Sequence, residues 1–207
     1  MEFALKLASI FFTMILVDNY VLSKFLGICP FLGVSKKLDS AVGMSLAVTF
    51  VMVMATAATW PIYMYVLVPE GSAGTSRDLG YLQTIVFILI IAILVQLLET
   101  FLKKFVPALY RALGVYLPLI TTNCTILGVT ILNIDNGYSF VEAIVCAAGA
   151  GIGYLVAMVM FSGVRRRVEQ ANTPACFEGL PITLVAAAVT SLSFMGFGGI
   201  VEAIFGV

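Results

Sequence analysis

The chain has 207 residues, of which 61% are hydrophobic and 11% are charged, with equal numbers of basic and acidic side chains. Its mean hydropathy is +1.10, and a soluble domain of this size could not bury so much apolar surface, so a soluble globular protein is excluded. The chain contains no histidine, which excludes a histidine general base, Rieske-type ligation and histidine-ligated haem.

Six apolar segments are each long enough to cross a hydrocarbon core about 30 Å thick as a helix. In chain order they are Phe3–Leu22, Ala41–Val68, Leu79–Leu102, Pro107–Leu132, Phe140–Val164 and Leu180–Phe205. The sequence therefore predicts an all-α polytopic membrane protein, with one membrane domain over residues 1–207. No small-residue cleavage site follows the first segment, so we expect a retained span and not a signal peptide.

Lysine and arginine residues are distributed unevenly over the predicted joints. On one side lie Lys24, Lys36, Lys37, Lys103, Lys104, Arg111, Arg165, Arg166 and Arg167, and only Lys6 and Arg77 lie on the other. Because basic residues are enriched in cytoplasmic loops, we expect both termini to face away from the cytoplasm. Lys24 is close to an apolar cysteine motif, and the bias remains without it.

A seven-residue pattern occurs once in each half of the chain. Cys29–Ser35 is echoed by Cys124–Thr130, with Cys, Leu, Gly and Val at matching places. The halves divide near Lys104, into repeat 1 (about 1–104) and repeat 2 (about 105–207). Each half holds three predicted spans, an odd number, so the sequence predicts two inverted three-helix repeats. Cys29 and Cys124 should then approach each other from opposite membrane faces.

Both cysteine motifs interrupt the helical pattern. Residues 24–37 are too few to span as a helix, and Pro30 removes a backbone donor there. Pro118 can break the helix that precedes the second motif, where Thr122 and Asn123 can satisfy the freed backbone groups. We therefore expect broken or re-entrant segments at both motifs, covered by other protein.

Thiolate is a soft ligand that suits iron–sulfur clusters, zinc or copper(I). An iron–sulfur cluster normally takes four cysteines, so Cys29 and Cys124 would need two more from a partner. Two alternatives remain open: the cysteines are small packing residues, or they form a disulfide. Cys146, in the fifth predicted span, and Cys176, in a predicted loop, lie outside the repeat, and we expect both to be packing residues.

Phe25–Lys37 and Leu117–Cys124 resemble the signatures of the A-subunit family of the Rnf complex, which is similar to the E subunit of the sodium-translocating NADH:quinone oxidoreductase. The resemblance extends over nearly the whole chain. It implies a membrane subunit of an ion-translocating ferredoxin:NAD⁺ oxidoreductase in a bacterial or archaeal cytoplasmic (inner) membrane, with no catalysis by this chain alone.

The resemblance also implies a cofactor and partners. Cys29 and Cys124 would hold a [2Fe–2S] cluster together with two cysteines of a homologous, oppositely oriented subunit, similar to the Rnf E subunit. That cluster would relay electrons across the membrane. Further partners would be subunits similar to Rnf B, C, D and G. Ferredoxin and NAD(H) would be handled only through the complex, and no nucleic acid is expected.

Other residues have weaker indications. Asn123, Thr122 and Pro30 lie beside the cysteines, and the Asn123 amide could donate to a cluster sulfur or cap a helix. Asp18 and Glu99 are candidates for an ion path, because ionisable groups at membrane depth are usually functional. Alternatively Asp18 pairs with Lys24, and Glu99 pairs with Lys103 at helical spacing.

Two rival functions use the same features differently. A secondary transporter with inverted repeats would present broken helices to an ion or small solute, and its cysteines would be structural. A purely structural anchor for neighbouring subunits is the other rival. The small residues of Gly149–Gly153 lack the setting of a phosphate loop and instead predict a close helix–helix approach.

Overall fold

The computed structural model describes residues 2–35, 38–67, 82–105, 120, 123–171, 174 and 177–196. Within these residues the secondary structure is helical. The helices are α1 (Glu2–Leu16), α2 (Ile28–Val34), α3 (Leu38–Ile62), the π-helix η1 (Tyr63–Leu67), α4 (Gln83–Phe105), α7 (Cys124–Asp135), α8 (Phe140–Glu169) and α9 (Leu180–Met195).

Three helical stretches are long and apolar enough to cross a membrane: Ser40–Leu67, Gln83–Phe101 and Phe140–Glu169. They correspond to the second, third and fifth predicted spans. Shorter apolar helices cover parts of the first, fourth and sixth. The expectation of an all-α membrane protein with several apolar helices is thereby confirmed. Pro61 lies near the end of α3, where the helix passes into η1.

Helix α8 is central, because it packs against α1, α3, α7 and α9. Its small residues permit this packing. Gly149 and Gly153 lie against the backbone of α1, and Gly151 lies against Thr49 of α3. The predicted close approach at these glycines is confirmed. A capping box begins α8, since the Glu142 carboxylate accepts hydrogen bonds from the backbone N–H and the hydroxyl of Ser139.

The prediction of a continuous first span over Phe3–Leu22 is wrong. Helix α1 ends at Leu16, and Asn19 occupies the break with its side chain. The Asn19 Oδ1 accepts from the Val21 backbone N–H at 3.1 Å, and its Nδ2 donates to the Gly153 carbonyl at 2.8 Å. The amide side chain thus pairs with the Val21 N–H, which a continuing helix would have paired, and it also links the break to α8 through Gly153.

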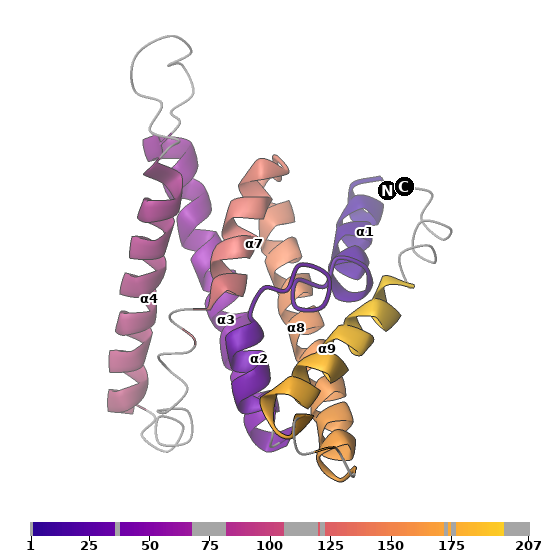
Figure 1. Ribbon diagram of the computed structural model, residues 1–207. Helices are drawn as coiled ribbons and strands as arrows, with labels where there is room; N and C mark the ends of the chain where they lie inside the picture. The colour runs from indigo at the N-terminus through magenta and orange to yellow at the C-terminus, as the bar shows by residue number, and fades with distance from the viewer. Residues whose placement is uncertain are drawn as a thin grey trace.

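The two short helices α2 and α7 run in opposite directions. Figure 1 shows α2 leading from the middle of the bundle to the end where α3 begins, and α7 leading from the middle to the opposite end. Helix α1 ends at Leu16 and α2 begins at Ile28, so non-helical residues separate the two helices before the first cysteine motif.

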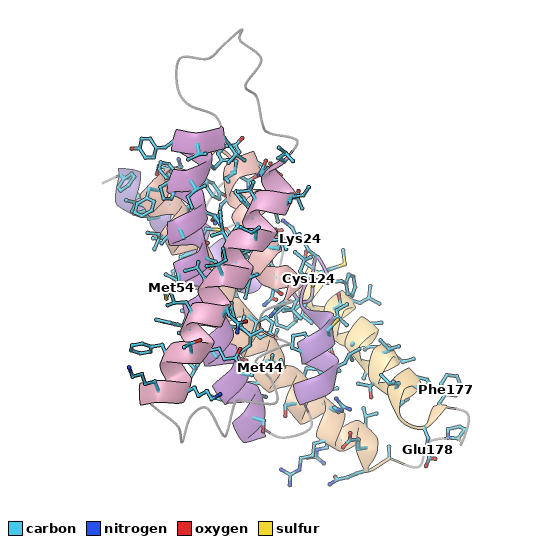
Figure 2. The ribbon with its side chains drawn as sticks, turned by 90° about the vertical axis from the view of Figure 1, so that its left-hand side faces the viewer. Lys24, Met44, Met54, Cys124, Phe177 and Glu178 are labelled. Carbon is cyan, nitrogen blue, oxygen red and sulfur yellow. The ribbon has the colours of Figure 1, made fainter. Side chains whose placement is uncertain are left out.

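Basic side chains in the last turns of α4 and α8 gather at one end of the bundle, whereas Lys6 of α1 lies beside Glu142 at the start of α8. Helices α4 and α8 both end where α3 begins (Figure 1), and their last turns carry Lys103, Lys104, Arg166 and Arg167. Lys24 does not belong to this group, because Figure 2 shows it near the level of Cys124, midway along the bundle. Lys36, Lys37, Arg77 and Arg111 lie outside the described residues.

Candidate metal centre

Each cysteine of the repeat lies in the first turn of a short helix. Cys29 is the second residue of α2, and Cys124 is the first residue of α7. Pro30 follows at the third position of α2, where its missing N–H would have had no partner within the helix. Asn123 caps α7, because its Oδ1 accepts from the Thr125 backbone N–H at 3.1 Å. Thr122 lies outside the described residues.

The two cysteine motifs are in direct contact. The backbone N–H of Gly27, the residue before α2, donates a hydrogen bond to the Cys124 Sγ at 2.9 Å. Next to it, Leu26 packs on Gly128, where an added Cβ would lie only 2.5 Å from the Leu26 Cδ1. Because Gly27 and Gly128 have no side chain, side chains of one half of the chain can pack directly on the backbone of the other half.

This contact brings the two thiols near each other. Cys29 is two residues beyond Gly27, and consecutive Cα atoms are about 3.8 Å apart, so the Cα atoms of Gly27 and Cys29 are at most about 7.6 Å apart. Both Cys29 and Cys124 are exposed on the surface of the chain, and both are free thiols. The disulfide alternative is therefore not realised in this structure.

The two exposed thiols could supply part of the ligand set of a metal centre. The described residues contain no group of three or more His, Cys, Asp and Glu side chains that could hold a metal ion. Cys29 and Cys124 supply two soft ligands on an open surface, which leaves room for two ligands from a partner. The Gly27 N–H already donates to one of the sulfurs, as backbone amides commonly do around iron–sulfur clusters.

The remaining cysteines are not part of this surface. Cys146 is fully buried in the core on α8, in agreement with the expectation of a packing residue. Cys176 lies outside the described residues.

Arg165 is a site residue that the sequence did not distinguish from its neighbours. From the sequence, Arg165, Arg166 and Arg167 are equivalent members of the basic bias that orients the chain. In the structure Arg165 is 8% exposed, and its guanidinium donates to the Leu32 carbonyl and to the Ser35 Oγ at the end of α2. A cation at the carbonyl end of a helix is stabilising, so Arg165 fixes the helix that carries Cys29.

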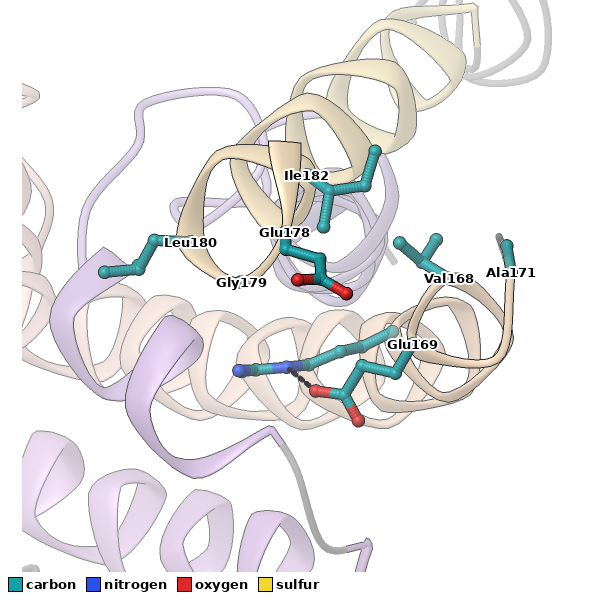
Figure 3. A pocket seen from close by; sticks show the side chains of 8 residues that line it. Val168, Glu169, Ala171, Glu178, Gly179, Leu180 and Ile182 are labelled. Carbon is teal, nitrogen blue, oxygen red and sulfur yellow. Dashed lines mark hydrogen bonds and ion pairs between the residues drawn. The ribbon is translucent and has the colours of Figure 1, made fainter. Parts of the chain in front are cut away.

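A pocket of about 540 Å³ opens beside Arg165, between the end of α8 and the start of α9. Glu169 accepts a 3.0 Å hydrogen bond from Arg165 Nε. Figure 3 shows Glu178, from the turn before α9, facing Glu169 across this pocket. The pocket therefore lies beside the residue that holds the far end of α2, and not beside the cysteines.

The two candidates for an ion path differ in their surroundings. Asp18 lies half-buried in the break after α1, and Glu99 lies half-buried on α4 near its basic end. Among the described residues, neither carboxylate forms the ion pair proposed for it. Lys24 instead places its Nζ 5.0 Å from the centre of the Tyr20 ring.

Comparisons with known proteins identify the family of this chain. The family described as "Rnf-Nqr subunit, membrane protein" matches residues 7–201. The chain is 52% identical over 195 residues to the A subunit of the Na⁺-translocating ferredoxin:NAD⁺ oxidoreductase complex of Acetobacterium woodii, covering 94% of this chain and 98% of that protein. It is 51% identical to the A subunit of the ion-translocating oxidoreductase complex of Syntrophotalea carbinolica, covering 90% and 93%. The corresponding protein of Serratia proteamaculans is 50% identical, covering 91% and 94%.

Proposed function

The chain belongs to the Rnf-Nqr family of membrane proteins, and from this premise we propose that it is the A subunit of an ion-translocating ferredoxin:NAD⁺ oxidoreductase complex. Identity near one half to relatives with that name, over nine-tenths or more of both chains, supports the proposal. In such a complex this chain performs no bond-making chemistry of its own. Ferredoxin and NAD(H) are handled by the other subunits.

We propose that the chain relays electrons through a [2Fe–2S] cluster held jointly by Cys29, Cys124 and two cysteines of a homologous subunit of inverted topology. The observation that carries this proposal is the hydrogen bond from the Gly27 N–H to the Cys124 Sγ, which joins the two motifs at an exposed surface. When bound, the cluster supplies one-electron transfer within the membrane. The chain's own residues orient the thiols and cover them on one side.

The proposed topology is six crossings arranged as two inverted repeats, about 1–104 and 105–207, in a bacterial cytoplasmic membrane. The opposite directions of α2 and α7 support the inversion. The basic residues at one end of the bundle support an orientation with that end in the cytoplasm and both termini on the other side. The first crossing then consists of α1 and α2, interrupted at the cysteine motif.

A secondary transporter is the second candidate, because short helices that begin midway through a membrane are typical of transporter sites. In that case the cysteines would only pack against neighbouring helices. The two functions differ in iron content, since only the relay requires iron and acid-labile sulfide in the purified complex.

The experiment that tests the relay is low-temperature EPR on the purified, reduced complex. Cys29→Ser and Cys124→Ser should each remove or alter one [2Fe–2S] signal while the complex still assembles. Cys146→Ala is the matched control, because Cys146 is a buried thiol of the core, and it should leave every signal unchanged. Wild-type signals in both serine variants would eliminate the relay and favour the transporter.

A further inference from the structure

The break between α1 and α2 presents exposed residues midway along the bundle. Residues 17–27 are not helical, and Ser23, Lys24 and Phe25 among them are exposed. Figure 2 shows Lys24 near the level of Cys124. At membrane depth, irregular backbone and a charged side chain do not face lipid, because hydrocarbon cannot pair their polar groups. This surface is therefore covered either by protein or by water.

The surface beside the break is apolar, which favours protein over water. Phe25 is 54% exposed, and it lines a hollow of about 120 Å³ between α2 and α9 whose described lining residues are all apolar. Phe25 also has a φ of 56°, in the left-handed region that bulky residues rarely adopt. Backbone strain of this kind is concentrated at functional sites, and aromatic residues are enriched at interfaces between proteins.

One face of α2 continues this surface to the first thiol. Cys29 and Gly33 lie on the same face, because they are four residues apart on a helix. Both are exposed, and a Cβ atom added to Gly33 would meet no described atom within 4 Å. The neighbouring residues Ile28 and Leu32 line the hollow. The thiol and the glycine therefore belong to one open surface that extends to Phe25.

The chain itself contains an example of what packs on a glycine at this place of the motif. Gly128 follows Cys124 by four residues, as Gly33 follows Cys29. Leu26 covers Gly128, since a Cβ atom added there would lie only 2.5 Å from the Leu26 Cδ1. One motif thus docks on the other by placing an apolar side chain on its glycine. The matching place on α2 is open.

We propose that Gly33 is the seat for an apolar side chain of the homologous subunit that supplies the other two thiols. The contact between the subunits then repeats the Leu26–Gly128 contact within the chain. Because glycine has no side chain, the partner can approach α2 closely one helical turn from Cys29, where a shared cluster requires it. The identity of the partner rests on the proposed relay, whereas the need for a protein cover rests on the exposed break.

Side-chain size at Gly33 tests the seat. Gly33→Leu fills it, Gly33→Ala fills it only in part, and Gly163→Leu is the matched control. Gly163 is also an exposed helical glycine, and a Cβ atom added to it meets no described atom within 4 Å. Leucine has room on the chain at both positions and favours a helix more than glycine does, so both variants should fold.

The first readout is the amount of the homologous subunit that co-purifies with the affinity-tagged chain. Overfilling a packed contact should lower this amount by about tenfold in Gly33→Leu, with loss of the same fraction of the [2Fe–2S] signal. Gly33→Ala should cause a smaller loss, and Gly163→Leu should retain the wild-type amount. Full retention of the subunit in Gly33→Leu overturns the inference. So does an equal loss in Gly163→Leu, because that result shows only a general effect of a larger side chain.

The second readout is a cryo-EM map of the wild-type complex, which does not depend on how well the variants accumulate. It should show an apolar side chain of the homologous subunit within about 4.5 Å of the Gly33 Cα. Lipid density on Gly33, or a subunit unrelated to this chain in that place, overturns the inference.

Failure of the relay can be told apart from failure of this inference. If the serine variants of Cys29 and Cys124 keep every EPR signal, the relay fails, and the map still decides which subunit lies on Gly33. If those variants lose the signal while Gly33→Leu keeps both the homologous subunit and the signal, the relay stands and the seat on Gly33 is refuted.

Discussion

The backbone N–H of Gly27 donates a 2.9 Å hydrogen bond to the Sγ of Cys124, and the two residues are 97 positions apart in the chain. Because Gly27 precedes α2 and Cys124 begins α7, this bond joins the starts of two short helices that run in opposite directions (Figure 1). The two thiols of the repeat therefore occupy one surface, and the residues that support this arrangement can be tested individually.

Gly27→Ala should destabilise the protein and disrupt the thiol pair. Gly27 has a φ of 83°, and an added Cβ would overlap the Thr125 Oγ1. The left-handed backbone alone costs alanine about 1–2 kcal/mol, and displacing α7 adds to that cost. A thermal-unfolding midpoint of the purified complex measures the loss. Gly43→Ala is the control, because space is open around Gly43, and an equal loss in both variants would contradict the prediction.

Arg165→Gln should lower stability by about 2 kcal/mol, in the range for hydrogen bonds made by buried charged groups. It removes the contacts with the Leu32 carbonyl and the Ser35 hydroxyl that hold the end of α2. Arg166→Gln removes the same charge from an exposed neighbour and should change stability by less than about 0.5 kcal/mol. If thermal unfolding and the EPR line shape respond equally to both variants, Arg165 acts only through its charge.

Lys6→Met should lower the unfolding midpoint more than its exposed position suggests. Its Nζ lies 2.5 Å from Glu142 Oε1, and the Glu142 side chain is only 7% exposed, so the variant leaves a carboxylate without its cation. Adding Glu142→Gln should restore part of the loss, since an amide needs no counterion. A double-mutant cycle measures this coupling, and strictly additive effects would refute it.

Lys24→Gln should lower the midpoint potential of the proposed cluster, making it harder to reduce. Lys24 is an exposed cation at the level of Cys124 (Figure 2), and no described acidic residue forms an ion pair with it. A nearby positive charge favours the more negative, reduced state of a cluster. Lys24→Arg keeps the charge and should stay near the wild-type potential. A redox titration in which both variants shift alike would show that the charge is not responsible.

Asp18→Asn should reduce ion translocation in proteoliposomes more than Glu99→Gln does. Asp18 lies in the break after α1 and has no ion-pair partner among the described residues, as expected of a functional carboxylate at membrane depth. Glu99 lies near the end of α4 that carries Lys103 and Lys104, where a carboxylate is tolerated. Normal translocation by Asp18→Asn, with electron transfer also intact, would remove Asp18 from the ion path.

Several features could be predicted because they depend on short stretches of sequence. The apolar segments around α3, α4 and α8 are long enough to identify spans directly, and Cys29 and Cys124 could be paired by their matching neighbours. Two roles were open for Asn123 from the sequence, and the structure contains one of them, the helix cap. The end of α1 at Leu16 was missed, because an apolar run gives no sign that the Asn19 side chain pairs with the backbone around it.

The sequence by itself determined that this protein folds in a membrane and which segments can cross that membrane. It also determined that the chain has two equivalent thiols and no histidine. These properties are sums over neighbouring residues, so they can be obtained from composition and order alone. Only the tertiary structure decided which arginine holds α2 and which glycine donates to Cys124. It also decided that Asn123, Thr125 and Tyr154 lie around Gly27. Those properties depend on which distant segments come into contact, and three adjacent arginines differ only in the direction that each faces on the helix.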